Sequence, residues 1–105
     1  MKWYKNLYVG ESIEHKKKKV IWKIKHSAGM LHTYVITFPS NPDNLLDIIP
    51  TTDLMQKAYP KDKLMVIGIA GDYDEALELT RQIVDETYHE TGRVDVYNYL
   101  KSLEE

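Results

Sequence analysis

The sequence predicts an α/β fold in which a small, two- to three-stranded parallel sheet is covered by helices. Strand-like and helix-like segments alternate in the order β-α-β-α-α-β-α-α, which is typical of α/β layer folds. Residues 64–70 are a continuous apolar run, as expected of a strand buried on both faces. The chain has 105 residues, of which 43% are hydrophobic and 29% charged, so we expect a single domain over residues 1–105.

The first two predicted elements are a strand and a long helix. Residues 3–9 are rich in aromatic and β-branched types and end at Gly10. Ser12 is a suitable N-cap for a helix over residues 12–28, and Gly29 suits its C-terminal end. At about 100° per residue, one apolar arc of this helix collects Ile13, Val20, Ile21, Ile24 and Ala28.

A β-hairpin is the alternative for residues 18–26. Val20, Trp22 and Ile24 alternate with lysines, and Gly29 would supply the turn. Ile21 breaks this alternation because it would face the lysine side. The helix is therefore the preferred interpretation.

The middle of the chain predicts one strand and two short helices. Residues 30–38 are free of helix and strand breakers and rich in strand formers. Asn41 and Pro42 are typical of a helix start, and Pro50 would end that helix. Its apolar residues would be Leu45, Leu46, Ile48 and Ile49. A second short helix would be capped by Thr51 or Thr52, stop before Pro60, and bury Leu54, Met55 and Ala58.

The C-terminal third predicts a buried strand and two helices. The strand covers residues 63–70 and turns at Gly71, after which Asp72 caps a helix that extends to about His89. The helical spacing places Ala76, Leu79, Ile83, Val84 and Thr87 on its buried side. Asp95 would cap a last helix that holds Val96, Tyr99, Leu100 and Leu103. If residues 3–9 do not form a strand, two strands remain, and because two strands alone are marginal, a homodimer could supply the missing coverage.

The net charge of -2 hides a strong separation along the chain. Residues 1–26 carry a charge of +6, residues 27–71 carry -1, and residues 72–105 carry -7. Such asymmetry suggests either that the two ends pair within the fold or that they attract a partner.

The lysine-rich segment is the first candidate binding surface. Helical geometry places Lys16, Lys19 and Lys23 on one flank and Lys18 and Lys25 on another, while Lys17 faces the apolar arc. Trp22 falls opposite the apolar arc, between the two flanks. The candidate residues are Lys16, Lys18, Lys19, Trp22, Lys23 and Lys25. This surface could be a solvated or internally paired face, a site for a protein partner, or one for nucleic acid or an anionic surface.

Two strand–glycine–helix turns are the second candidate. Free N–H groups at helix starts bind anions, so we consider a ligand or anion site at Gly10, Ser12, Gly71 and Asp72. Neither turn has a Walker or dinucleotide-binding pattern. The acidic residues Glu11, Asp72 and Asp74 already lie at these helix ends and would compete with an incoming phosphate.

Other chemistry finds no support in the sequence. No cysteine is present, which excludes disulfides, thiol nucleophiles and zinc–thiolate sites. The four histidines (His15, His26, His32 and His89) form no metal-binding pair on one helix, and no catalytic motif appears. We therefore expect no enzymatic activity, no catalytic or metal-ligating residues and no cofactor. With no apolar run near 20 residues and no signal peptide, we expect a cytoplasmic protein without a membrane span.

Four stretches of the sequence resemble a family of short proteins of unknown function from Gram-positive bacteria. They are residues 7–12 (LYVGES), the lysine run, residues 41–46 (NPDNLL) and residues 73–79 (YDEALEL). The resemblance implies a stand-alone bacterial protein and assigns no activity. The sequence therefore favours a non-enzymatic interaction or regulatory module that self-associates. Its alternatives are nucleic-acid or anionic-surface binding through residues 12–28, and a small-ligand site or enzyme at the carboxyl ends of the strands.

Overall fold

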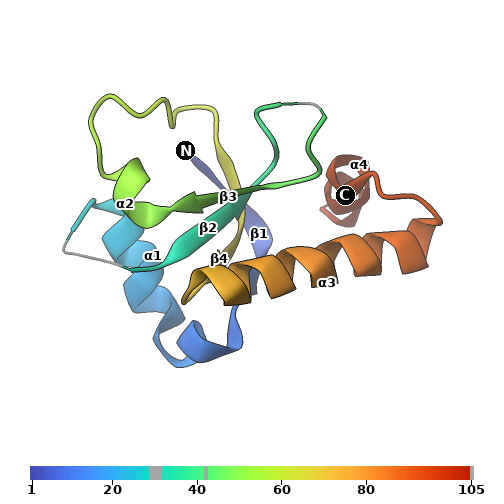
Figure 1. Ribbon diagram of the computed structural model, residues 1–105, viewed down its shortest axis with the longest axis horizontal. Coiled ribbons are helices and arrows are strands. Elements are labelled where there is room, and N and C mark those ends of the chain that lie inside the picture. Colours follow the sequence, from blue (N-terminus) through green and yellow to red (C-terminus); the bar gives the residue numbers. More distant parts are fainter. Residues whose placement is uncertain (29–31, 42, 105) are drawn as a thin grey trace.

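Four strands form one mixed sheet in the residues that the computed structural model describes, namely 1–28, 32–41 and 43–104 (Figure 1). Strands β1 (Lys2–Val9) and β4 (Met65–Ala70) are parallel neighbours. Strand β2 (Tyr34–Thr37) lies antiparallel to β4 and to β3 (Asp47–Pro50), which gives the order β1-β4-β2-β3. The α/β class is confirmed, whereas the expected parallel sheet of two to three strands is wrong in both strand number and direction.

Strand β3 replaces a predicted helix. Ile48 and Ile49 lie opposite Ile36 and Val35 of β2. Both are β-branched, and this residue type fits a strand that extends the sheet better than it fits a helix. Before β3, the Asn41 side-chain oxygen accepts the Asp43 N–H, and the Asn41 carbonyl oxygen accepts the Asn44 N–H, each at 3.0 Å. Asn41 therefore makes a turn instead of a helix cap. The predicted role of Pro42 lies outside the described residues.

The lysine-rich segment is helical, and the hairpin alternative is wrong. It begins as the 3₁₀ helix η1 (Glu11–Lys16) and continues as α1 (Lys17–Lys25). Ser12 is not the N-cap, because Gly10 holds that position without a side-chain bond. The helix also ends before residue 28, with Ser27 in a left-handed conformation (φ 48°). The predicted C-terminal role of Gly29 lies outside the described residues.

Helices α3 (Tyr73–Thr91) and α4 (Val96–Leu103) follow their predicted caps closely. The second predicted short helix is only the single turn α2 (Thr51–Leu54), whose N-cap is Pro50 instead of Thr51 or Thr52, and Met55 and the exposed Ala58 lie beyond its end. The Asp72 carboxylate accepts the Glu75 N–H at 2.7 Å, and Asp95 accepts the Asn98 N–H at 3.3 Å. Gly92 ends α3 in the left-handed region that glycine favours.

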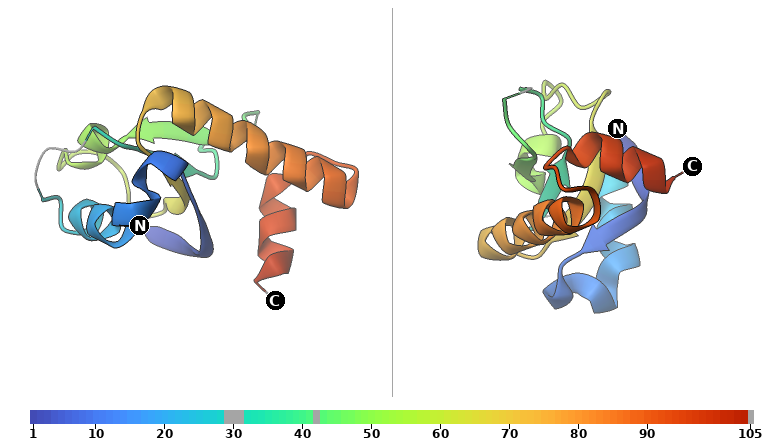
Figure 2. Two further views of the ribbon diagram at one scale, coloured as in Figure 1. Left: turned by 90° about the horizontal axis from the view of Figure 1, so that it is seen from below. Right: turned by 90° about the vertical axis from the view of Figure 1, so that its right-hand side faces the viewer.

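Helices cover both faces of the sheet. On one face, α1 and α2 pack through Val20, Ile24 and Leu54 against Val66 and Ile69 of β4. On the other, α3 and α4 pack around Ile67, with α4 leaving the end of α3 at a steep angle (Figure 2). The cluster on this face consists of Tyr4, Ile36, Ile67, Leu79, Ile83, Val96 and Leu100. The prediction that the 64–70 strand is buried on both faces is confirmed, and the sheet needs no second copy to cover it.

Candidate anion-binding site

A basic cavity lies where the parallel strands β1 and β4 end. Ser12 follows the carboxyl end of β1 and Gly71 follows that of β4, so the two turns meet at one edge of the sheet. The cavity has a volume of about 460 Å³. Its lining, which we call the lysine cavity, consists of Ser12, Ile13, Lys16, Lys19, Val20, Lys23, His32, Thr33 and Gly71.

The apolar arc of the helix positions the lysines of this cavity. Ile13 and Val20 are buried in the core and fix the rotation of η1 and α1 against the sheet. Lys19 and Lys23, one turn apart, then reach the cavity from the edge of the buried arc. The sequence predicted that Lys16, Lys19 and Lys23 share one flank, and all three line the cavity.

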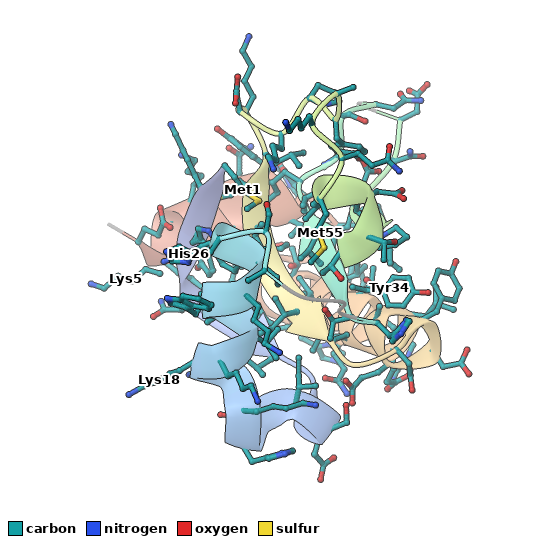
Figure 3. All side chains as sticks on the ribbon, turned by 90° about the vertical axis from the view of Figure 1, so that its left-hand side faces the viewer. Met1, Lys5, Lys18, His26, Tyr34 and Met55 are labelled. Atoms are coloured by element: carbon teal, nitrogen blue, oxygen red, sulfur yellow. The ribbon has the colours of Figure 1, made fainter. Side chains whose placement is uncertain are left out.

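The remaining residues of the predicted binding surface lie outside the lysine cavity. The Lys25 ammonium is 5.5 Å from the centroid of the Trp3 ring in β1. Lys18 is exposed and extends away from α1 into solvent (Figure 3). Trp22, which helical geometry places opposite the apolar arc, is 54% exposed. The residues of the predicted binding surface are therefore divided between a cavity and an outer helix face.

The basic and acidic segments do not neutralise each other in the fold. Among the residues that the structure describes, the two ion pairs join Arg81 to Glu78 and to Asp85, all within α3. No described lysine lies within 4.0 Å of a carboxylate oxygen. The cause is the sheet, which separates α1 on one face from α3 on the other. The expected pairing between the two ends of the chain is not observed.

The two predicted anion turns already bind a carboxylate, that of Glu75. Its oxygens accept bonds from the Ser12 N–H (3.0 Å), the Ser12 hydroxyl (2.8 Å) and the Gly71 N–H (2.7 Å). We call this arrangement the Glu75 clasp. A Cβ atom at Gly10 would lie 2.1 Å from a Glu75 carboxylate oxygen, and one at Gly71 would lie 2.3 Å from the Ser12 hydroxyl. The glycines thus let the two turns close on this side chain.

The clasp corrects the predicted anion site at Gly10, Ser12, Gly71 and Asp72. Gly71 and Ser12 give their N–H groups to Glu75, and Asp72 is the N-cap of α3. An incoming anion in the adjacent cavity would therefore meet lysine ammonium groups instead of free turn N–H groups. The sequence predicted that the carboxylates of Glu11, Asp72 and Asp74 would compete with an anion at these turns. The carboxylate that occupies the turn N–H groups is instead that of Glu75.

Replacing Glu75 with glutamine should lower the free energy of unfolding by about 1 to 2 kcal/mol at neutral pH, because the charged acceptor of three hydrogen bonds is lost. Burial raises the pKa of Glu75, but the bonds from Gly71 and Ser12 outweigh it and lower that pKa overall. The stabilisation is therefore present above the unfolded-state pKa of about 4.3 and is lost as the pH falls through the folded-state value.

Urea unfolding of the wild type and E75Q, from neutral pH to about pH 3, measures the difference between their free energies of unfolding. The two curves should converge in acid. The control is Glu11→Gln, an exposed residue beside the clasp, which should change stability by less than about 0.5 kcal/mol. A constant difference at all pH values would mean that the charge of Glu75 is not what stabilises the turns.

Sequence reasoning missed Glu75 as an acceptor and His32 and Thr33 as cavity residues. A signal for Glu75 was present, since an acidic N-cap followed three residues later by glutamate is the pattern of a capping box. Here the glutamate reaches one residue further back, to Gly71, and across to Ser12. His32 and Thr33 reach the cavity because β2 runs antiparallel to β4, which no local pattern reveals.

A second polar cluster lies between β1, α3 and α4. One carboxylate oxygen of Glu86 accepts hydrogen bonds of 2.8 Å from both Tyr8 and Tyr99, and the Tyr4 hydroxyl donates to the Leu100 carbonyl at 3.1 Å. Burial and the bond to Glu86 raise the pKa of Tyr99 to about 12, and the same causes raise the pKa of Tyr8 further. This cluster ties three elements together.

The part of the chain that the structure describes contains no group of three or more His, Asp or Glu side chains arranged to hold a metal ion. It also contains no helix long and apolar enough to cross a membrane. Comparison of the chain with protein-family models, curated proteins and solved structures found no match.

Proposed function

We propose that this protein is a non-enzymatic binding module that holds a phosphate-bearing anion in the lysine cavity. The observation that carries the proposal is the convergence of Lys16, Lys19 and Lys23 on one cavity, with no carboxylate oxygen within 4.0 Å of any described lysine. Ammonium groups left without a counter-charge attract phosphate oxygens, and a partly enclosed site strengthens that attraction.

The dimensions of the cavity favour a ligand with more than one phosphate. Lys16 and Lys23 are seven residues apart, so their stems are spread over about 11 Å of helix axis. Three ammonium groups spread along that span suit a ligand with two phosphates better than a single phosphate. The volume of about 460 Å³ lies within the range of small-molecule sites, and Ile13 and Val20 provide an apolar wall for the remainder of the ligand.

Calorimetric titration with inorganic pyrophosphate at low ionic strength tests the proposal. The triple variant K16A/K19A/K23A should bind at least tenfold more weakly, since each lysine contributes a charge-assisted hydrogen bond. The control K5A/K57A/K63A removes the same number of positive charges from residues outside the cavity and should retain most of the affinity. Equal losses of affinity in the two variants would mean that pyrophosphate binding depends only on net charge and not on this cavity. No binding by the wild type would refute the proposal.

Self-association is a second candidate function, supported by a different surface. Helix α3 exposes Tyr73, Leu77 and Tyr88, whose spacing places them along one side of the helix. The edge of Tyr73 contacts the ring of Tyr34 in β2, so this side of α3 faces toward β2 and the open edge strand β3. Exposed apolar side chains beside an open sheet edge favour contact with a second copy.

Light scattering at micromolar concentration tests self-association. A dimer mass for the wild type and a monomer mass for Leu77→Glu would support it, because a charge at the centre of such a contact is costly. A monomer mass for the wild type would reject it and would leave the lysine cavity proposal unaffected.

A further inference from the structure

The outer face of α1 carries an aromatic pair next to the lysine cavity. The rings of Trp22 and His26 are stacked, with centroids 4.4 Å apart and planes inclined by 22°. The His26 Nδ1–H donates to the Trp22 carbonyl oxygen at 2.8 Å, which holds the imidazole in place. The indole is therefore supported on one side while 54% of the residue remains exposed.

Lysines surround this pair on the helix. At about 100° per residue, Trp22 lies between Lys18 on one side and Lys19 on the other, and Lys19 also lines the lysine cavity. Figure 3 views the molecule from this side, with Lys18 labelled on α1 and His26 labelled at the end of that helix. The face thus presents an aromatic surface flanked by lysines on the same helix, which is the combination that binds bases and phosphates together.

We propose that the phosphate-bearing ligand is a single-stranded nucleic acid, with one base stacked on Trp22 and the adjacent phosphates in the lysine cavity. This inference rests on the proposed function and names the ligand class of that same site. An unpaired base can lie flat on an exposed indole, whereas the bases of a duplex are stacked on one another and cannot.

The same face is poorly suited to a lipid surface. A helix that lies in a membrane interface needs an apolar face directed outward. In α1 the apolar arc is directed inward, because Val20 and Ile24 are buried in the core and Ile21 packs against it. This leaves Trp22 as the large exposed apolar side chain of the helix.

Fluorescence anisotropy with a labelled oligothymidylate of about eight nucleotides tests this inference. Trp22→Ala should weaken binding by about 5- to 100-fold, the range expected for loss of one base–aromatic stack. Tyr97→Ala is the matched control, because Tyr97 is a similarly exposed aromatic residue (51%) on α4, on the other face of the sheet. Its affinity should equal that of the wild type. The logarithm of the binding constant should fall with that of the salt concentration with a slope of about -2 to -3, as three to four phosphates are neutralised.

The outcomes separate this inference from the proposed function. If pyrophosphate binds but the oligonucleotide does not, the nucleic-acid ligand is wrong and the anion site stands. If the oligonucleotide binds equally well to W22A and the wild type, base stacking is wrong. Tighter binding to anionic phosphatidylserine vesicles than to the oligonucleotide would overturn the choice of ligand. If neither pyrophosphate nor the oligonucleotide binds, both proposals fail.

Discussion

Ile67→Ala should lower the free energy of unfolding by about 3 to 4 kcal/mol, the largest effect expected for one side chain in this protein. Ile67 is fully buried in β4, the strand that pairs with both β1 and β2. Its side chain packs in the cluster that joins the sheet to α3 and α4. Truncation removes apolar contacts and leaves a cavity that neighbours on a central strand cannot easily fill.

Urea denaturation followed by circular dichroism measures this loss, with the slope of the transition unchanged if only stability is altered. Leu45→Ala is the control, because Leu45 is 47% exposed and its truncation should cost less than about 0.5 kcal/mol. A loss below about 1 kcal/mol for Ile67→Ala would contradict the central position of β4.

Glu86→Ala should lower the free energy of unfolding by about 2 to 3 kcal/mol at neutral pH. The substitution removes the charged acceptor that Tyr8 and Tyr99 share, and it leaves two half-buried hydroxyl groups without that partner. Because these residues come from β1, α3 and α4, the loss should weaken the attachment of α4 in particular. Hydrogen exchange of the α4 amides would report this local effect.

The same cluster predicts a loss of stability in alkali. The folded-state pKa values of Tyr8 and Tyr99 are raised, Tyr99 to about 12, so folding favours the neutral tyrosines. Their contribution is complete below the unfolded-state pKa of about 10 and is lost as the pH rises through the folded-state values. The wild type should lose stability between about pH 10 and 12, and the Glu86→Ala variant should lose less.

Tyrosinate absorbance during a pH titration checks the assignment. Tyr8→Phe and Tyr99→Phe should each remove one late-titrating group from the absorbance curve. If all tyrosines of the wild type titrate near pH 10, the hydrogen bonds to Glu86 do not persist in solution.

Elements with strong local signals could be predicted from the sequence. The caps Asp72 and Asp95 and the stop at Gly92 fix α3 and α4 through backbone hydrogen bonds made within a few residues. The burial of residues 64–70 on both faces follows from their uniform apolar character. The exposure of Trp22 follows from helical geometry once the apolar arc is known.

Features set by long-range pairing could not be predicted in the same way. The residues of β3 have a mixed local preference, and their pairing with β2 makes them a strand. The lysine flank was visible in the sequence, but its closure into a cavity depends on Thr33 and Gly71, which the sheet brings from two other strand ends. Local sequence patterns also could not predict that Glu75 accepts the hydrogen bonds of Ser12, because the two residues are 63 positions apart in the sequence.

The placement of α1 and α3 on opposite faces of the sheet separates most of the positive charge of residues 1–26 from most of the negative charge of residues 72–105, and so gives the molecule an electric dipole. The shortest dimension of the molecule is 26 Å, whereas electrostatic screening at physiological ionic strength acts over about 8 Å. A polyanion at the lysine face is therefore shielded from the charges of the far side, and the overall charge of -2 does not determine its binding. At lower ionic strength the dipole would turn the approaching protein so that α1 meets the polyanion first.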